Sequence, residues 1–172
     1  MSKLLNAIGF QAGWWACVAG VGRGREWEAL VFCALLAGIH LRCSKHPLQE
    51  ARLALVAWIV GVGMDSLLQH LGVIRFHGGA LAPLSPFWLW ALWVMFAFTL
   101  NASLSFLHKS LGLAALAGLA FGPMTYYAGA QLGAASLEAA PAHLLALAVA
   151  WMLAMPLLVW AAKRMAAERG GH

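Results

Sequence analysis

Charged residues are scarce in this sequence. Lys, Arg, Asp and Glu make up 10% of its 172 residues, against about a quarter in a soluble domain, while 63% of the residues are hydrophobic. A chain with so few charges cannot cover a soluble surface, so the composition predicts an integral membrane protein. The length allows one compact bundle, residues 1–172, with no separate soluble domain.

Cysteine and catalytic motifs are equally sparse. Cys17, Cys33 and Cys43 form no CxxC pair, which argues against a disulfide framework or a zinc site and favours a role as small apolar residues. The sequence contains no nucleophile elbow, phosphate loop, HExxH or paired-carboxylate motif. Its basic residues are spread over the connections without a basic stripe, so nucleic acid is not an expected partner. We expect no cofactor and no bound metal.

Long apolar runs dominate what is present. Gly, Pro and charged residues divide the chain into six such runs: residues 4–21, 27–41, 53–74, 87–107, 111–134 and 142–162. Each approaches the ~20 residues that a helix needs to cross a bilayer. The sequence therefore predicts an all-α bundle of six transmembrane helices. The spacings Gly118–Gly122 and Gly129–Gly133 match the small-xxx-small pattern, which indicates close helix packing.

The distribution of Lys and Arg predicts the orientation of this bundle. With six crossings, the two ends of the chain and the even-numbered connections share one side, which holds eight basic residues: Lys3, Arg42, Lys45, Arg52, Lys109, Lys163, Arg164 and Arg169. The other side holds three: Arg23, Arg25 and Arg75. Because basic residues favour the cytoplasmic side, we expect both termini in the cytoplasm and a multi-pass protein of the bacterial inner membrane.

Asp65 is the one carboxylate deep inside an apolar run. It lies ~15 Å along a helix from Arg75, near the middle of the membrane. An ionisable group at this depth is costly in lipid, so Asp65 should face the bundle interior, beside a residue of the first or fifth run. It could carry a proton, bind a cation, or be a protonated hydrogen-bonding group. A purely structural polar cluster with Gln69 and His70 is the alternative.

Other polar residues fall at depths from which they could meet Asp65. Gln11 is near the middle of the first run, and Tyr126 and Tyr127 reach the outer half of the fifth, whereas Asn101 lies in the inner half of the fourth. Depth alone therefore suggests one polar cavity in the outer half of the membrane. Its candidate residues are Gln11, Asp65, Gln69, His70, Asn101, Tyr126 and Tyr127.

Four stretches of the sequence carry a resemblance to a known family. They are residues 13–18 (GWWACV), 65–68 (DSLL) with Gly72, 90–104 (with Trp90, Trp93, Phe96, Thr99, Asn101 and Ser103), and 122–134 (GPMTYYAGAQLGA). In this order they resemble a bacterial inner-membrane family known as domain of unknown function 2878. The resemblance covers nearly the whole chain. It implies a small polytopic inner-membrane protein, and it implies no assigned activity, cofactor or catalytic residue.

Two classes of function remain. The first is a non-enzymatic protein that binds or translocates a small or lipid-like ligand in the polar cavity near Asp65. The second is an intramembrane enzyme of lipid modification, with Asp65 and His70 as an acid–base pair; a scaffold for a partner membrane protein is a further alternative. The sequence favours the first class, because an enzyme usually needs more than one ionisable pair and the connections are too short for a soluble active site.

Overall fold

The structure is a computed structural model that describes residues 2–138 and 140–168; Arg169, counted above among the basic residues, and the rest of the tail lie outside them. Its elements are α1 (Lys3–Gly22), α2 (Glu26–Cys43), α3 (Pro47–His70), β1 (Arg75–Phe76), α4 (Phe87–Leu100), the 3₁₀ helix η1 (Ser105–Lys109), α5 (Leu111–Gln131), β2 (Ala135–Ser136) and α6 (Pro141–Ala167). The all-α prediction is confirmed, apart from one two-residue ladder.

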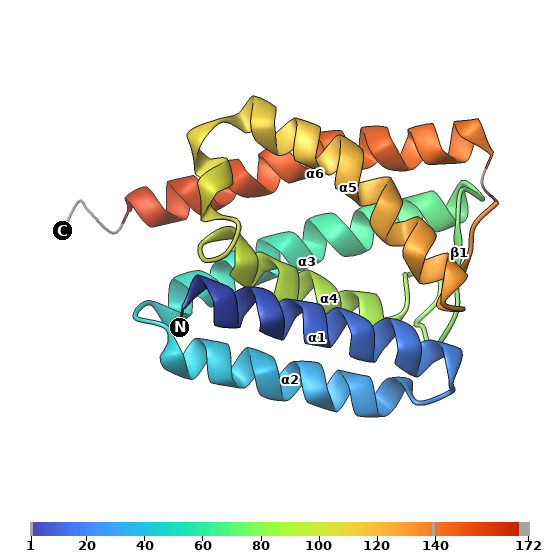
Figure 1. Cartoon of the computed structure of the whole chain (residues 1–172), viewed down its shortest axis with the longest axis horizontal. Helices are drawn as coiled ribbons and strands as arrows, with labels where there is room; N and C mark the ends of the chain where they lie inside the picture. The colour runs from blue at the N-terminus through green and yellow to red at the C-terminus, as the bar shows by residue number, and fades with distance from the viewer. Residues whose placement is uncertain (1, 139, 169–172) are drawn as a thin grey trace.

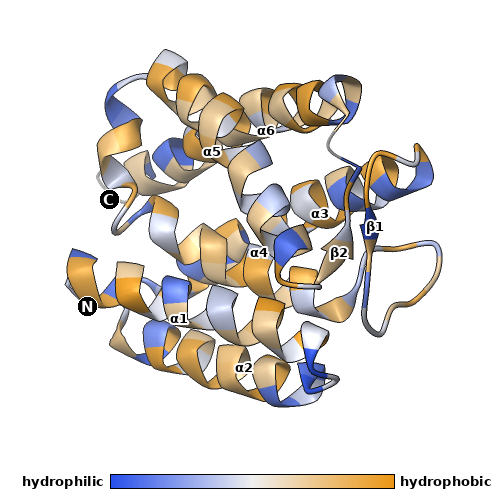
Figure 2. Cartoon of the chain, turned by 45° about the vertical axis from the view of Figure 1, so that its right-hand side comes forward, coloured by the Kyte–Doolittle hydropathy of each residue, from blue (hydrophilic) through white to orange (hydrophobic). Residues whose placement is uncertain are grey.

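Successive α-helices run in opposite directions. The start of α1 and the end of α6 lie at one end of the bundle, and β1 lies at the other (Figure 1). The central helix is α4, which packs against α1, α2, α3 and α6, while α5 packs mainly on α6. Four helices, α1, α3, α5 and α6, are long and apolar enough to cross a membrane. Hydrophobic residues cover most of the helix flanks, and hydrophilic residues gather near the helix ends and connections (Figure 2).

The boundaries of α3 differ from the predicted run, residues 53–74. The helix begins at Pro47, because a proline at the first helical position has no amide hydrogen left unpaired. It ends at His70, where Gly72 adopts a positive φ of 73° and the amide of Val73 donates to the carbonyl of Leu68 at 3.0 Å. Glu50 is therefore on the first turn of a helix rather than in a loop.

The fourth helix is shorter than predicted. It ends at Leu100 and not at Leu107, so its 14 residues span ~21 Å, less than the ~30 Å hydrocarbon core. Asn6 of α1 stabilises this end: its side-chain amide donates to the carbonyl of Phe98 at 3.1 Å and accepts from the hydroxyl of Ser103 at 2.7 Å. Irregular backbone is tolerated at membrane depth only where protein groups satisfy it, which is what Asn6 does here.

The two short strands join connections that are distant in sequence. β1 pairs antiparallel with β2, with Arg75 opposite Ser136 and Phe76 opposite Ala135. The imidazole of His77 donates through Nδ1 to the carbonyl of Gly133 at 2.9 Å and accepts from the hydroxyl of Ser136 at 2.8 Å. These contacts fix the α3–α4 and α5–α6 connections over one end of the bundle. We call residues 75–79 and 133–136 the terminal cap.

Candidate functional site

Asp65 is fully buried in the centre of the molecule. One carboxylate oxygen accepts the indole N–H of Trp93 at 2.7 Å, and the other accepts the hydroxyl of Tyr126. Because Tyr126 belongs to α5, the expectation that Asp65 faces the interior beside a residue of the first or fifth run is confirmed. Among residues 2–138 and 140–168 Asp65 has no ion pair, so two neutral donors hold it.

Gly61 makes room for this arrangement. It lies four residues before Asp65 and therefore on the same face of α3. A Cβ atom at this position would overlap the indole of Trp93, so a glycine is needed for the ring to lie flat on the helix. Gly61 thus leaves space for the indole ring of Trp93, and Asp65 accepts a hydrogen bond from the N–H of that ring.

The two donors pack against a third aromatic residue. Trp151 of α6 stacks on Trp93, with ring centroids 5.1 Å apart and an angle of 17° between the planes. Tyr126 meets the same Trp151 ring edge to face, at 6.1 Å between centroids. The four helices α3 to α6 are therefore joined through one buried cluster, made of Asp65, Trp93, Tyr126 and Trp151.

A small cavity lies against the rings of this cluster. It offers about 70 Å³ to the centres of water-sized molecules. Its wall residues come from α1, α4, α5, α6 and the connections that carry β1 and β2: Phe10, Trp14, Val18, Ile74, Phe76, Trp88, Leu89, Leu92, Trp93, Phe96, Thr125, Tyr126, Gly129, Ala134, Ala135 and Trp151. Trp93 and Tyr126 line it and Asp65 does not, so the rings separate the carboxylate from the cavity. One water needs about 10–15 Å³ by this measure, so there is room for several waters or a slender apolar group.

The cavity beside Asp65 has a mostly apolar wall, which differs from the polar cavity expected from the sequence. Its walls are mostly aromatic and aliphatic. The polar atoms of Trp93 and Tyr126 are both engaged by Asp65, and the hydroxyl of Thr125 donates to the carbonyl of Phe121. The terminal cap closes one end through Phe76 and Ala135. Such a surface fits an apolar ligand, because a polar group placed there would lose its hydrogen bonds to water.

A wider groove adjoins the cavity. It runs between α1 and α5, offers about 520 Å³ by the same measure, and shares five wall residues with the cavity: Phe10, Trp14, Phe96, Thr125 and Trp151. Its rim carries large apolar side chains with high exposure, among them Trp15 (51%) and Phe121 (65%). In a bilayer this rim would face acyl chains. We call it the lateral groove.

The structure brings together only part of the predicted candidate set. Asp65 and Tyr126 are in contact, and Gln11 lines the lateral groove. Gln69 accepts the amide of Phe76 at 3.2 Å and so supports the terminal cap. His70 and Tyr127 are exposed and do not reach Asp65.

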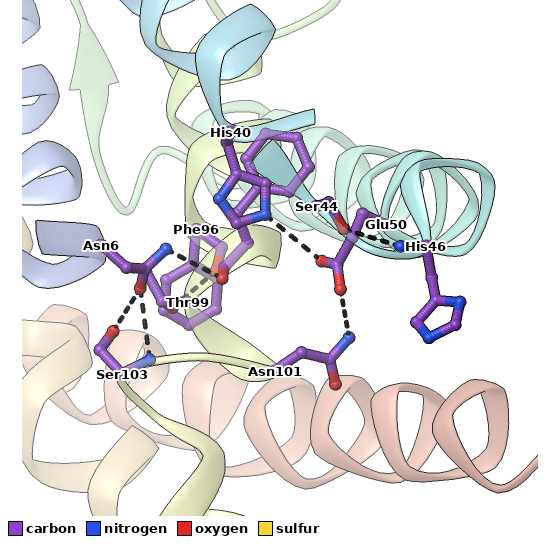
Figure 3. A network of polar contacts seen from close by, with 10 residues as sticks. Asn6, His40, Ser44, His46, Glu50, Phe96, Thr99, Asn101 and Ser103 are labelled. Carbon is purple, nitrogen blue, oxygen red and sulfur yellow. Dashed lines mark hydrogen bonds and ion pairs between the residues drawn. The ribbon is translucent and has the colours of Figure 1, made fainter. Parts of the chain in front are cut away.

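Asn101, the remaining candidate, belongs to a second polar cluster at the opposite end of the molecule. Its amide donates to Glu50 at 3.2 Å, and the other carboxylate oxygen of Glu50 lies 3.6 Å from Nε2 of His40 (Figure 3). His40 stacks on the ring of Phe98 at 4.2 Å. Both Glu50 and His40 are buried, and they join α2, α3 and the end of α4.

Glu50 was not predicted as a site residue, because residues 42–52, with Pro47 and several charges, were expected to form a loop. The available signal was Pro47 followed three residues later by an acid, which is typical of the first turn of a helix. No group of three or more His, Cys, Asp or Glu side chains within the described part of the chain is placed to hold a metal ion.

Comparison with known proteins gives one match. The model of the family described as a protein of unknown function (DUF2878) matches residues 3–157. No curated protein and no solved structure matches the chain. Since the matched residues cover most of the sequence, the resemblance is confirmed: this chain belongs to the DUF2878 family.

Proposed function

We propose that this protein is a multi-pass membrane protein that binds the apolar chain of a lipid-like molecule in the aromatic cavity. The observation that carries the proposal is that the lateral groove adjoins the cavity, with five wall residues in common, so that only these side chains separate the two. A chain from the surrounding bilayer could enter the groove sideways and pass between the rings of Phe10 and Trp151. Transfer of apolar surface into such a site is favourable by ~25 cal/mol per Å² wherever it replaces contact with water.

The membrane setting of this proposal is the one that the charge pattern predicts. Four helices suit a bilayer by length and composition, and the alternating helix directions support six crossings. We propose that both termini are cytoplasmic in the bacterial inner membrane. The short helix α4 fits this arrangement because other helices surround it and Asn6 satisfies its end.

The geometry favours this reading over an enzyme that uses Asp65 and His70. His70 is exposed and lies on another face of α3 from Asp65. The rings of Trp93 and Tyr126 stand between the carboxylate and the cavity. A general acid or base must come within hydrogen-bond reach of its substrate, and Asp65 has no such access in this structure.

A substitution that fills the cavity tests the proposal. Gly129 is a buried wall residue, and a Cβ atom built on it meets nothing within 4 Å. Gly129→Leu should therefore occupy the cavity without disturbing the helix. In native mass spectrometry of protein purified in mild detergent, we expect it to retain about tenfold less lipid, the effect of losing about two buried methylene contacts.

The matched control is Gly63→Leu in α3. A Cβ atom at Gly63 also meets nothing within 4 Å, but this residue is exposed and lines no part of the cavity. Both substitutions raise helix propensity by a similar amount. Equal lipid retention by the two variants would refute binding in the cavity.

A further inference from the structure

A second hollow adjoins one end of the lateral groove. At the end where α1 finishes, a shallow hollow of about 590 Å³ shares Trp15 and Leu132 with the groove. Its other wall residues come from α1, α2 and the turn between them, including Arg23, Arg25 and Glu28. An elongated molecule in the groove would therefore reach a charged surface after passing Trp15 and Leu132.

The charge of this hollow is unbalanced. Arg25 forms a salt bridge with Glu28, in which its Nε donates at 2.7 Å. Arg23 has no ion pair among residues 2–138 and 140–168, and it is exposed. One guanidinium group thus remains available, and this planar group matches the oxygens of a phosphate or carboxylate.

The dimensions fit an amphiphile that lies along the bundle. The groove is lined by α5 from Ala117 to Leu132, which corresponds to ~22 Å along a helix. Half of a bilayer's hydrocarbon core is ~15 Å thick, so one lipid chain can lie in the groove. Tryptophan and basic side chains are common where a protein meets the membrane–water interface, and Trp15 and Arg23 are such a pair at the end of the groove.

We infer that the ligand of the proposed function is an anionic amphiphile whose phosphate or carboxylate head group binds Arg23 while its chain passes along the lateral groove and ends in the aromatic cavity. This inference rests on the proposed function and specifies the chemical class of the ligand. The source of the anion is a lipid head group, because the apolar path behind Trp15 and Leu132 gives a free anion nothing further to bind.

Arg75 provides a matched comparison. It lies at the same end of the molecule, in a separate hollow that also contains Gln69, Glu138 and His143. That hollow shares no wall residue with the lateral groove, and it meets the aromatic cavity only at Ile74 and Ala135, neither of which lines the groove. Removing either arginine lowers the net charge by the same amount. A difference in lipid binding between the two variants therefore reflects the position of the arginine and not the net charge.

The test uses the detergent-purified full chain titrated with dioleoyl phosphatidic acid and with dioleoylglycerol, which differ only by the phosphate. Native mass spectrometry measures the bound fraction. We expect the wild type to prefer the phosphatidic acid, and Arg23→Gln to reduce that preference about fivefold, the weight of one arginine near a membrane surface. Arg75→Gln should keep the preference. Inorganic phosphate at millimolar concentration should displace neither lipid.

Several results would overturn the inference. If Arg23→Gln and Arg75→Gln lose the preference for phosphatidic acid equally, the net charge of the protein causes that preference. If Arg23→Gln keeps the preference, the head group binds elsewhere. Displacement of phosphatidic acid by inorganic phosphate would indicate a site for the free anion. If both lipids bind equally and Gly129→Leu still lowers their retention about tenfold, the inference fails while the proposed function stands. If neither lipid binds, both fail.

Discussion

Asp65 illustrates how a carboxylate is held in an apolar molecule without a cationic partner. Its two oxygens accept one indole N–H and one phenol O–H, from Trp93 and Tyr126. In return, two large polar aromatic side chains that line the cavity are fixed in position. We therefore interpret Asp65 as a residue that positions the cavity wall.

Two substitutions of Asp65 should separate hydrogen bonding from charge. Asp65→Leu removes both acceptors and should lower the free energy of unfolding by about 2–5 kcal/mol, since it leaves two buried donors unpaired. Asp65→Asn keeps an oxygen for Trp93 and offers an amide hydrogen to the oxygen of Tyr126, so it should keep the fold. Thermal unfolding of the purified variants measures the difference; equal stability of the two would contradict this role.

A second comparison at the same position concerns activity. Asp65→Asn should reduce lipid retention more than Asn101→Ala, because it reverses the hydrogen bond that holds Tyr126 in the cavity wall, whereas Asn101 lies in the separate cluster with Glu50. Loss of Asn101 removes an interhelical hydrogen bond of about 0.6–2 kcal/mol. If Asp65→Asn retains lipid as well as the wild type, the carboxylate is purely structural.

The partners of Asp65 show what could be predicted at this scale. The cost of a carboxylate in lipid was enough to predict its burial. Depth, however, gives only the position along the membrane normal. His70 follows Asp65 by five residues, which rotates it by about 140° around the helix and away from the site. Trp93 could not be identified as a partner, because the packing of α4 on α3 depends on the fit of its ring against Gly61.

At the scale of elements, α5 and α6 form the tightest pair. Gly118 and Gly122 of α5 lie against Trp151 of α6, and a Cβ atom at either position would overlap it. The small-xxx-small spacing thus has its predicted role in packing for this pair. The second pair differs, since Gly129 faces the cavity and Gly133 ends the helix with a positive φ of 84°.

Gly118→Ala should destabilise the α5–α6 pair. The added methyl group would meet the backbone carbonyl of Trp151, which cannot move as a side chain could, so we expect a loss of about 1–3 kcal/mol. Gly112→Ala is the control, because its Cβ atom would meet only the hydroxyl of Ser110 at 3.5 Å. Thermal unfolding of the two variants in detergent measures the difference. If Gly118→Ala is as stable as Gly112→Ala, α5 and α6 lie farther apart than in this structure.

The ends of helices were harder to predict than their existence. All six runs correspond to helices, since their apolar residues follow from the needs of a bilayer. The end of α4 at Leu100 depends on Asn6, which is 92 residues from Phe98 in sequence and invisible to local patterns. The His40–Glu50 pair was missed for two reasons: the local sign of a helix start at Pro47 was read as a loop, and the burial of Glu50 requires α2 and α4 to cover the first turn of α3.

The whole molecule has two chemically different ends. One end carries the terminal cap with Arg23, Arg25 and Arg75, and the other carries most of the basic residues. Reporter fusions at the C-terminus and within residues 81–86 should therefore report opposite sides of the membrane, with the C-terminus cytoplasmic. A periplasmic C-terminus would contradict the proposed orientation and would place the hollow at Arg23 on the cytoplasmic side.

The claim on which this account depends is that a lipid chain occupies the aromatic cavity. An experimental structure of the protein in lipid nanodiscs tests it most directly. We predict elongated density that enters through the lateral groove and ends against Trp93, Tyr126 and Phe76. A cavity closed by the surrounding rings, or filled only by discrete water density, would contradict the account.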